Sequence, residues 1–110
     1  MHIFPALSAP ALEYIDEHYA SASLSVPQLA ALCGISEVHL RRSFQRAFSL
    51  SPAIYVRNKR IAYAKELLLS EEYSVTEVAF LAGFNDAAYF AREFKKAVGV
   101  TPSMYRKEME

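Results

Sequence analysis

The chain contains two copies of one pattern, and this repeat restricts its fold more than any other feature. Matching positions are 49 residues apart up to Asn85 and 50 apart after it, so the second copy carries one extra residue there. Because the match tolerates an insertion, the repeated object is a whole supersecondary unit. The pairs are Ser25/Ser74, Gly34/Gly83 and Ser36/Asn85 at the shorter spacing, and Leu40/Phe90, Arg42/Arg92, Phe44/Phe94, Pro52/Pro102 and Tyr55/Tyr105 at the longer one.

Residues 52–69 (PAIYVRNKRIAYAKELLL), between the two copies, predict one long helix. Its apolar residues fall in two arcs on opposite sides of a helical wheel, whereas a surface helix has a single stripe. We therefore predict that the helix is wedged between the two units. The first arc holds Ile54, Ile61, Ala64 and Leu68, and the second holds Val56, Tyr63 and Leu67.

Local signals mark the starts of the remaining helices. Ser25-x-x-Gln28 and Ser74-x-x-Glu77 both predict capping boxes at the first helix of each copy. An earlier helix is predicted from about Pro10 to Tyr19. An N-cap residue followed by Pro predicts the start of a further helix, and a glycine in the left-handed conformation predicts the end of one. The residues concerned are Ser51-Pro52 and Thr101-Pro102 for the starts, and Gly34 and Gly83 for the ends.

Each glycine turn is followed by a helix with a basic outer face. The first begins at the N-cap Ser36 and runs to about Phe48, and the second runs from about Asp86 to Val98. Their buried stripes are predicted to be Leu40, Phe44 and Ala47, and Phe90, Phe94 and Ala97. Their outer faces hold Val38, Arg41, Arg42 and Gln45 with Arg46 beside them, and Ala88, Ala91, Arg92 and Lys95 with Lys96 beside them. This is helix-turn-helix anatomy, although one copy alone would equally suit an ordinary helical hairpin with a solvated face.

The charge distribution favours a polyanionic partner although the formal net charge is zero. Residues 1–37 contain four acids and no Lys or Arg, residues 38–65 contain seven bases and no acid, and the remaining chain has eight acids and five bases. For a polyanionic partner such as nucleic acid, the electrostatic field of a local basic surface matters more than the net charge of the whole chain. A solvated basic face remains the alternative.

Composition excludes several other classes of protein. At 110 residues the chain is long enough for one domain of ordinary size. The single Cys33 excludes an internal disulfide, and we expect no metal site and no cofactor. No apolar run reaches the ~20 residues that span a bilayer, so we expect a cytoplasmic protein. No catalytic set is visible, so we expect that the chain is not an enzyme.

At these residues the chain resembles the DNA-binding domain of AraC/XylS-family bacterial transcription regulators. The resemblance rests mainly on AFLAGFNDAAYFAREFKKAVGVTPSMYRK, with its frame GF, YF, R, FKK, G, TP and YR, and on the matching L, R, F and SP positions of LAALCGISEVHLRRSFQRAFSLSPAIY. It implies an all-α domain of seven helices in which two helix-turn-helix units are joined by a long central helix. The predicted limits are 1–110 for the single DNA-binding domain, with 8–50 and 74–108 for the two units and 52–69 for the linker helix.

The resemblance also implies which residues contact DNA. Base-edge contacts would come from Val38, Arg41, Arg42 and Gln45 in the first unit, and from Ala88, Ala91, Arg92 and Lys95 in the second. Phosphate or flanking contacts would come from Ser36, Arg46, Asn85 and Lys96. The chain departs from the family pattern at Ser49, where Gly is more usual, as at Gly99. Because alanine can touch a thymine methyl but cannot hydrogen-bond, we expect the first unit to read more of the bases.

The predicted function is a sequence-specific, double-stranded DNA-binding transcription regulator, and the residues leave open whether it is an activator or a repressor. It would read two successive major-groove segments of a promoter, and RNA polymerase is an expected further partner. The alternative is a helical protein-interaction module that contacts RNA polymerase or an adaptor. We expect the chain to be monomeric, with any dimerisation left to a further domain of a longer protein. The operator sequence, the target genes and an effector cannot be deduced from these residues.

Overall fold

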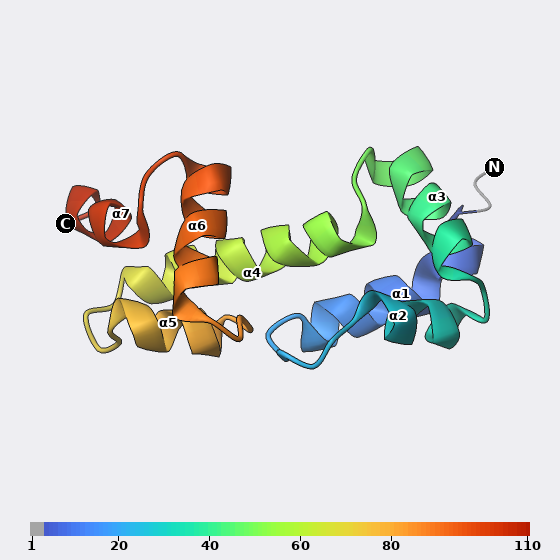
Figure 1. The fold of residues 1–110 in the computed structure, drawn as a ribbon, viewed down its shortest axis with the longest axis horizontal. Coiled ribbons are helices and arrows are strands. Elements are labelled where there is room, and N and C mark those ends of the chain that lie inside the picture. Colours follow the sequence, from blue (N-terminus) through green and yellow to red (C-terminus); the bar gives the residue numbers. More distant parts are fainter. Residues whose placement is uncertain (1–3) are drawn as a thin grey trace. The chain divides into compact units, whose positions relative to one another are not determined.

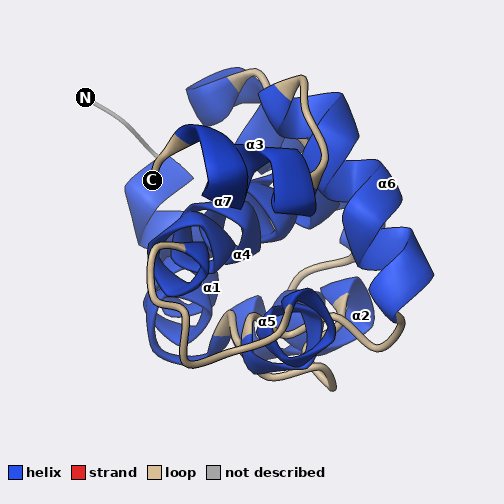
Figure 2. Cartoon of the chain, turned by 90° about the vertical axis from the view of Figure 1, so that its left-hand side faces the viewer, coloured by secondary structure: helices blue, strands red, loops and turns tan. Residues whose placement is uncertain are grey.

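The computed structural model describes residues 4–110, and side chains from Ala9 onward. Within that range the chain forms seven α-helices and no strand (Figures 1 and 2), which confirms the predicted all-α fold. The first helix begins at Phe4, earlier than predicted, and Pro10 lies inside it. The helices are α1 (Phe4–His18), α2 (Val26–Cys33), α3 (Glu37–Phe48), α4 (Pro52–Leu68), α5 (Val75–Leu81), α6 (Ala87–Val98) and α7 (Pro102–Glu108).

The chain divides into two compact units, and each has its own core. Unit 1 contains the described residues up to Tyr19 and Ser23–Arg57. Its core lies between α1, α2, α3 and the first turns of α4. The buried residues are Ala11, Ile15, Leu29, Ala30, Leu40, Phe44 and Val56.

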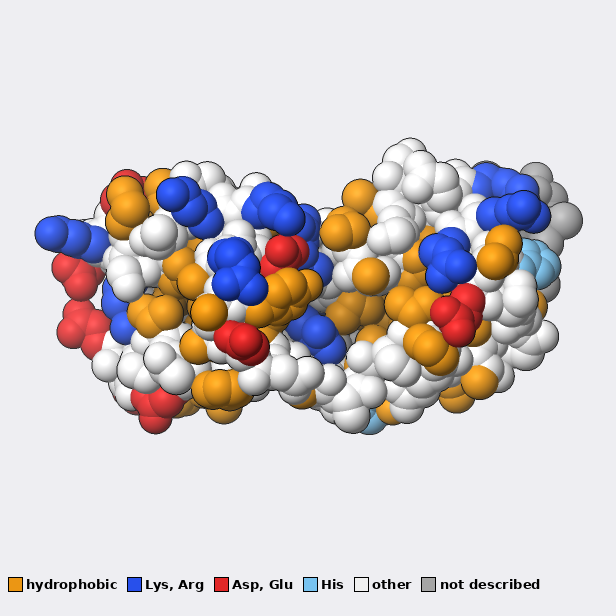
Figure 3. Space-filling view, in the orientation of Figure 1, with side chains coloured by type: hydrophobic (Ala, Val, Ile, Leu, Met, Phe, Trp, Pro, Cys, Tyr) orange, Lys and Arg blue, Asp and Glu red, His pale blue; other side chains and the backbone are white. Residues whose placement is uncertain are grey.

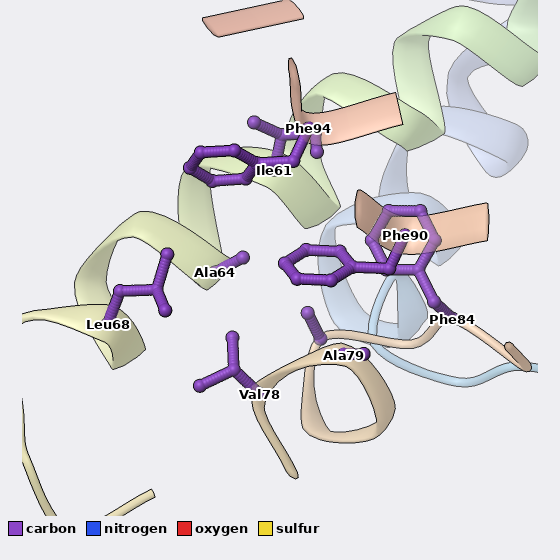
Figure 4. Packing of buried hydrophobic residues seen from close by; sticks show 9 residues of the cluster. Ile61, Ala64, Leu68, Val78, Ala79, Phe84, Phe90 and Phe94 are labelled. Atoms are coloured by element: carbon purple, nitrogen blue, oxygen red, sulfur yellow. The ribbon is translucent and has the colours of Figure 1, made fainter. Parts of the chain in front are cut away.

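Unit 2 is formed by Ala20–Ala22 and Asn58–Glu110. Three Phe side chains, from the α5–α6 turn and from α6, pack onto the remaining part of α4 and onto α5 (Figure 4). The buried residues are Ile61, Ala64, Leu68, Val78, Ala79, Ala82, Phe84, Phe90 and Phe94.

The sequence repeat reappears as a repeat of contacts. In unit 1 the rings of Phe44 and Tyr55 meet edge to face, with centroids 5.5 Å apart and an interplanar angle of 77°. In unit 2 the rings of Phe94 and Tyr105 do the same at 5.6 Å and 73°. Such edge-to-face pairs are the favoured geometry for aromatic rings. The register of 50 residues that was inferred from the sequence is therefore also the register of the two cores.

The glycine turns repeat in the same way at a spacing of 49. After Gly34, the Ile35 N–H donates to the Ala30 carbonyl over 3.1 Å, and after Gly83, the Phe84 N–H donates to the Ala79 carbonyl over 3.0 Å. Both glycines have positive φ, 66° and 106°. This is the hydrogen bond of a Schellman-type helix end, which a residue without a Cβ allows at low cost.

The predicted division of α4 into two opposite arcs is wrong. Val56 lies in the core of unit 1. Ile61 and Leu68, from the first arc, and Tyr63 and Leu67, from the second, all pack in or against the core of unit 2. The units thus share the helix along its length and not around its circumference. A 17-residue helix is about 25 Å long, so a different stretch of it can serve each small core.

The buried stripes of α3 and α6 also differ from the prediction in their last member. Ala47 and Ala97 are exposed. Phe48 instead contacts the Tyr55 ring, with centroids 4.9 Å apart, and Val98 packs against the core of unit 2. Each stripe therefore continues in steps of four residues, because i and i+4 lie on one helix face.

Only the second predicted capping box forms completely. The Ser74 hydroxyl accepts from the Glu77 N–H over 3.0 Å, and the Glu77 carboxylate accepts from the Ser74 N–H over 2.8 Å. The Ser25 hydroxyl likewise accepts from the Gln28 N–H over 3.3 Å. The Gln28 side chain, however, donates to the Tyr14 hydroxyl over 3.0 Å. A tertiary contact with α1 thus takes the place of the reciprocal half of the first box.

Candidate nucleic-acid interface

The sequence of α3 leaves one face of this helix in solvent. The Ser36 hydroxyl accepts from the His39 N–H over 3.0 Å, as an N-cap residue does. Leu40 and Phe44 are fully buried, and Ser43 is 4% exposed. The inner face of the helix is thereby committed to unit 1, and the opposite face is free for a partner.

That outer face carries all the residues that the sequence singled out on this helix. Val38 is 49% exposed. Arg41 forms an ion pair with Glu37 one turn earlier, with N and O 3.7 Å apart. Arg42 has no ion-pair partner among the described residues. The exposed side chains are Val38, Arg41, Arg42, Gln45 and Arg46.

The start of α6 is set by the extra residue in the second copy. Asp86, and not Asn85, is its N-cap, and the carboxylate accepts from the N–H groups of Ala88 and Tyr89 over 2.7 and 3.2 Å. A carboxylate here also complements the positive end of the helix dipole. The two amides that point out of this helix start therefore already have an anionic partner.

The outer face of α6 is basic but sparse. Arg92, Lys95 and Ala88 are exposed, and Ala91 is half-buried. Lys96 is exposed and pairs with Glu93, with N and O 3.4 Å apart. Figure 3 shows Lys and Arg side chains over α3 and over α6. The outer faces thus bring together the predicted residues within each helix, except that Ala91 is partly covered.

Sequence reasoning missed Tyr89 as a member of the outer face of α6. Its side chain is 46% exposed, next to Ala88. Tyr89 occupies the position that matches His39, which is also exposed. The repeat register could have indicated it, because both residues precede the buried Leu40 and Phe90 by one position.

The turn after α3 is the same as the turn after α6 despite the difference in sequence. Ser49 has φ 57° and ψ 29°, in the left-handed region, and Gly99 has φ 98°. Their N–H groups donate to the carbonyls of Gln45 and Lys95 over 2.9 and 2.8 Å. Replacement of the usual Gly by Ser therefore leaves the turn intact.

The basic block of residues 38–65 divides into exposed and structural charges. Its α4 members Arg57, Lys59, Arg60 and Lys65 are all half-buried. Arg60 donates to the Ser21 carbonyl over 2.8 Å and lies over the Phe84 ring at 5.9 Å. Burial lowers the pKa of its guanidinium, and the Tyr89 hydroxyl partly raises it again. The exposed arginines of this block lie on α3.

Other kinds of site find no support in the part of the chain that is described. No group of three His, Cys, Asp or Glu side chains lies within metal-binding reach in residues 4–110. Across the same range, no helix combines the length and the apolar character that crossing a membrane requires.

Comparison with known proteins assigns the chain to a family. Residues 29–108 match a helix-turn-helix domain family. Over 100 residues the chain is 31% identical to the arabinose operon regulatory protein of Escherichia coli strain K12, covering 91% of this chain and 34% of that protein. The chain belongs to the AraC family of transcription regulators.

Solved AraC-type domains share its fold. The C-terminal domain of AraT, a response regulator from Geobacillus stearothermophilus, aligns with a TM-score of 0.89 and 31% identity, covering 97% of this chain and 88% of that one. The DNA-binding domain of AdpA, solved in complex with a target DNA, aligns with a TM-score of 0.85 and 27% identity, covering 93% and 91%. The chain spans only 31% to 44% of the length of the first curated relatives that it matches.

Proposed function

We propose that this AraC-family domain binds double-stranded promoter DNA in a sequence-specific manner and reads most of the sequence through α3. The observation that carries the proposal is the outer face of α3. There, Arg41, Arg42 and Gln45 are exposed above a fully buried inner stripe. An exposed helix face of this width and charge suits insertion into a major groove.

Each side chain on this face matches a base-edge chemistry. An Arg can donate two hydrogen bonds to guanine, a Gln can pair with adenine, and an apolar group such as Val38 can contact a thymine methyl. Arg42 is available without a competing ion pair among the described residues. Arg41 must leave Glu37 first, but an exposed pair of this kind is worth only about 0–1 kcal/mol.

The α6 face would contribute less discrimination. Arg92 and Lys95 are its exposed hydrogen-bond donors at predicted reading positions, while Ala88 and Ala91 could supply only apolar contact with a thymine methyl. We propose that each unit, 8–50 and 74–108, reads one of two successive major-groove segments, with residues 52–69 as the linker.

Phosphate contacts would orient both helices on the duplex. Backbone amides at a helix start favour anions, so we assign this role to Ser36 and Asn85, with Arg46 and Lys96 beside them. The contact should be stronger at α3, because the Asp86 carboxylate already engages two amides of α6. A promoter target also implies a cytoplasmic, non-enzymatic role for the domain.

A second function is compatible with the same surface charges. The acid-rich chain after residue 65 could contact RNA polymerase or an adaptor while the two outer faces hold DNA. The domain itself would act as a monomer, with dimerisation supplied by the remainder of a longer regulator. A steep loss of DNA affinity with rising salt would mark phosphate contacts, whereas a protein interface need not show it.

Selection of bound duplexes from a random pool, followed by competition binding, tests the proposal. Arg42→Ala should reduce the preference for the selected sequence over random DNA by roughly 5- to 150-fold, the equivalent of about 1–3 kcal/mol for one bidentate base contact. Lys107→Ala removes an exposed charge on α7 and serves as the matched control. An unchanged preference in Arg42→Ala would contradict the assignment, and a failure to enrich any sequence would contradict specific reading altogether.

A further inference from the structure

The outer face of α5 in unit 2 carries a shallow, open apolar pocket of about 410 Å³. Tyr73, Glu77, Phe80 and Leu81 line it. Phe80 is 52% exposed and Leu81 is 44% exposed. Single exposed apolar residues are ordinary on protein surfaces, whereas neighbouring large ones leave apolar area in water that a partner can cover.

The internal repeat shows whether the fold itself requires these residues, because unit 1 forms the same turn with its own residues at the matching positions. Phe80 matches Ala31, and Leu81 matches Leu32, at the spacing of 49 residues. Unit 1 thus forms the same helix and the same glycine turn with Ala in place of Phe. A half-exposed ring at position 80 is therefore not required by the fold. The Phe80 ring leaves apolar surface exposed to water, and a bound partner would cover that surface.

The chain segment that forms the pocket is acidic, and its three carboxylates are called the acidic rim below. Residues 70–81 contain Glu71, Glu72 and Glu77 and no Lys, Arg or His. All three carboxylates belong to exposed residues, and Glu77 is held at the pocket by its hydrogen bond from the Ser74 N–H. Acidic and apolar side chains lie over α5 in Figure 3, while Lys and Arg gather over α6. Arg106 contacts the backbone of this segment but is half-buried, whereas the three carboxylates are exposed, so the accessible charge of residues 70–81 favours a cationic partner.

The connection that carries this rim is already ordered. The Arg106 guanidinium donates to three backbone carbonyls in and before it, over 2.9 Å to Leu68, 3.0 Å to Ser70 and 2.6 Å to Tyr73. Glu71 and Glu72 lie between two of these anchored residues. A surface that is ordered in advance loses less conformational entropy on binding.

We infer that this surface docks a segment of another protein in which one large apolar side chain is flanked by Lys or Arg. The apolar side chain would enter the pocket between Tyr73, Phe80 and Leu81, and the flanking cations would face Glu71 and Glu72. The inference does not depend on the proposed DNA contacts, because none of these residues belongs to α3 or α6.

A display selection with a random 12-residue peptide library on the wild-type domain tests the inference without a named partner. The enriched peptides should share a Leu, Phe or Trp flanked by Lys or Arg. A labelled copy of the most enriched peptide, titrated at moderate salt and followed by fluorescence anisotropy, should bind Phe80→Ala at least tenfold more weakly. Leu32→Ala removes from α2 the exposed side chain that matches Leu81, and this variant should bind the peptide as the wild type does.

The double variant Glu71→Lys/Glu72→Lys tests the acidic rim. It should bind the peptide at least fivefold more weakly than the wild type, and its affinity for the peptide should depend much less on salt. When the enriched peptide is added to the wild-type domain, the backbone NMR chemical shifts should change within residues 71–81. This result would locate the site without any variant. Lack of enrichment, enrichment of acidic peptides, or shifts confined to other residues would overturn the inference. Self-association that Phe80→Ala abolishes would assign the pocket to a second copy instead. DNA binding by the uncharged variant Phe80→Ala should be unchanged, so that failure of either proposal can be told from failure of the other.

Discussion

Replacement of Ser49 by Gly should stabilise unit 1. Within residues 4–110, Ser49 is the one non-Gly residue with positive φ, and its N–H donates to the Gln45 carbonyl. The left-handed conformation costs an L-residue about 1–2 kcal/mol. Glycine removes that cost. However, glycine has more conformational freedom in the unfolded chain, which lowers the free energy of unfolding by about 0.5–1 kcal/mol. Since Ser49 is exposed, the net gain should be about 0.5–1 kcal/mol in the free energy of unfolding.

The matching turn in unit 2 supplies the reverse experiment. Gly99 has φ 98°, and a Cβ added there would meet nothing within 4 Å. Gly99→Ser should therefore destabilise unit 2 through the backbone alone, by about 1 kcal/mol.

Urea and thermal unfolding followed by circular dichroism measure both changes. Ser49→Gly should raise the midpoint of thermal unfolding by about 2–8 °C, on the scale for domains of this size. Equal or lower stability of Ser49→Gly would refute the argument that the turn after α3 is strained. Equal stability of Gly99→Ser would show that the left-handed turn carries no conformational cost in this fold.

Two further changes test how unit 2 is held together. Arg106→Ala leaves three carbonyls without their charged donor, so the free energy of unfolding should fall by about 2–4 kcal/mol. Arg106→Lys should recover less than half of that loss, because an ammonium lacks the planar fork, and full recovery in urea unfolding would contradict this. Asp86→Ala should lower stability by about 1 kcal/mol through loss of the N-cap. The same change should tighten DNA binding at low salt, because two amides and the helix dipole become available to a phosphate, and weaker binding in a gel-shift titration would count against DNA contact at this helix start.

Much of the local structure could be predicted because short-range chemistry determines it. The Ser74 to Glu77 capping box and the glycine turns depend on residues that are close in sequence. The repeat register could be predicted for a different reason: two copies of one unit must bury matching positions, as Phe44 and Phe94 do. The outer faces of α3 and α6 followed from these buried stripes, since a helix with one side in a core exposes the other.

The tertiary structure decided which of several compatible partners each residue takes. Gln28 could complete a capping box from its spacing alone, yet its amide reaches Tyr14 because α1 packs beside α2. Arg60 belongs to the basic block by sequence, but burial and the Ser21 carbonyl remove it from the exposed set. The wheel of α4 could not reveal that the units divide the helix along its axis. Side-chain period is a property of the local backbone, whereas burial depends on which distant segments lie against each turn.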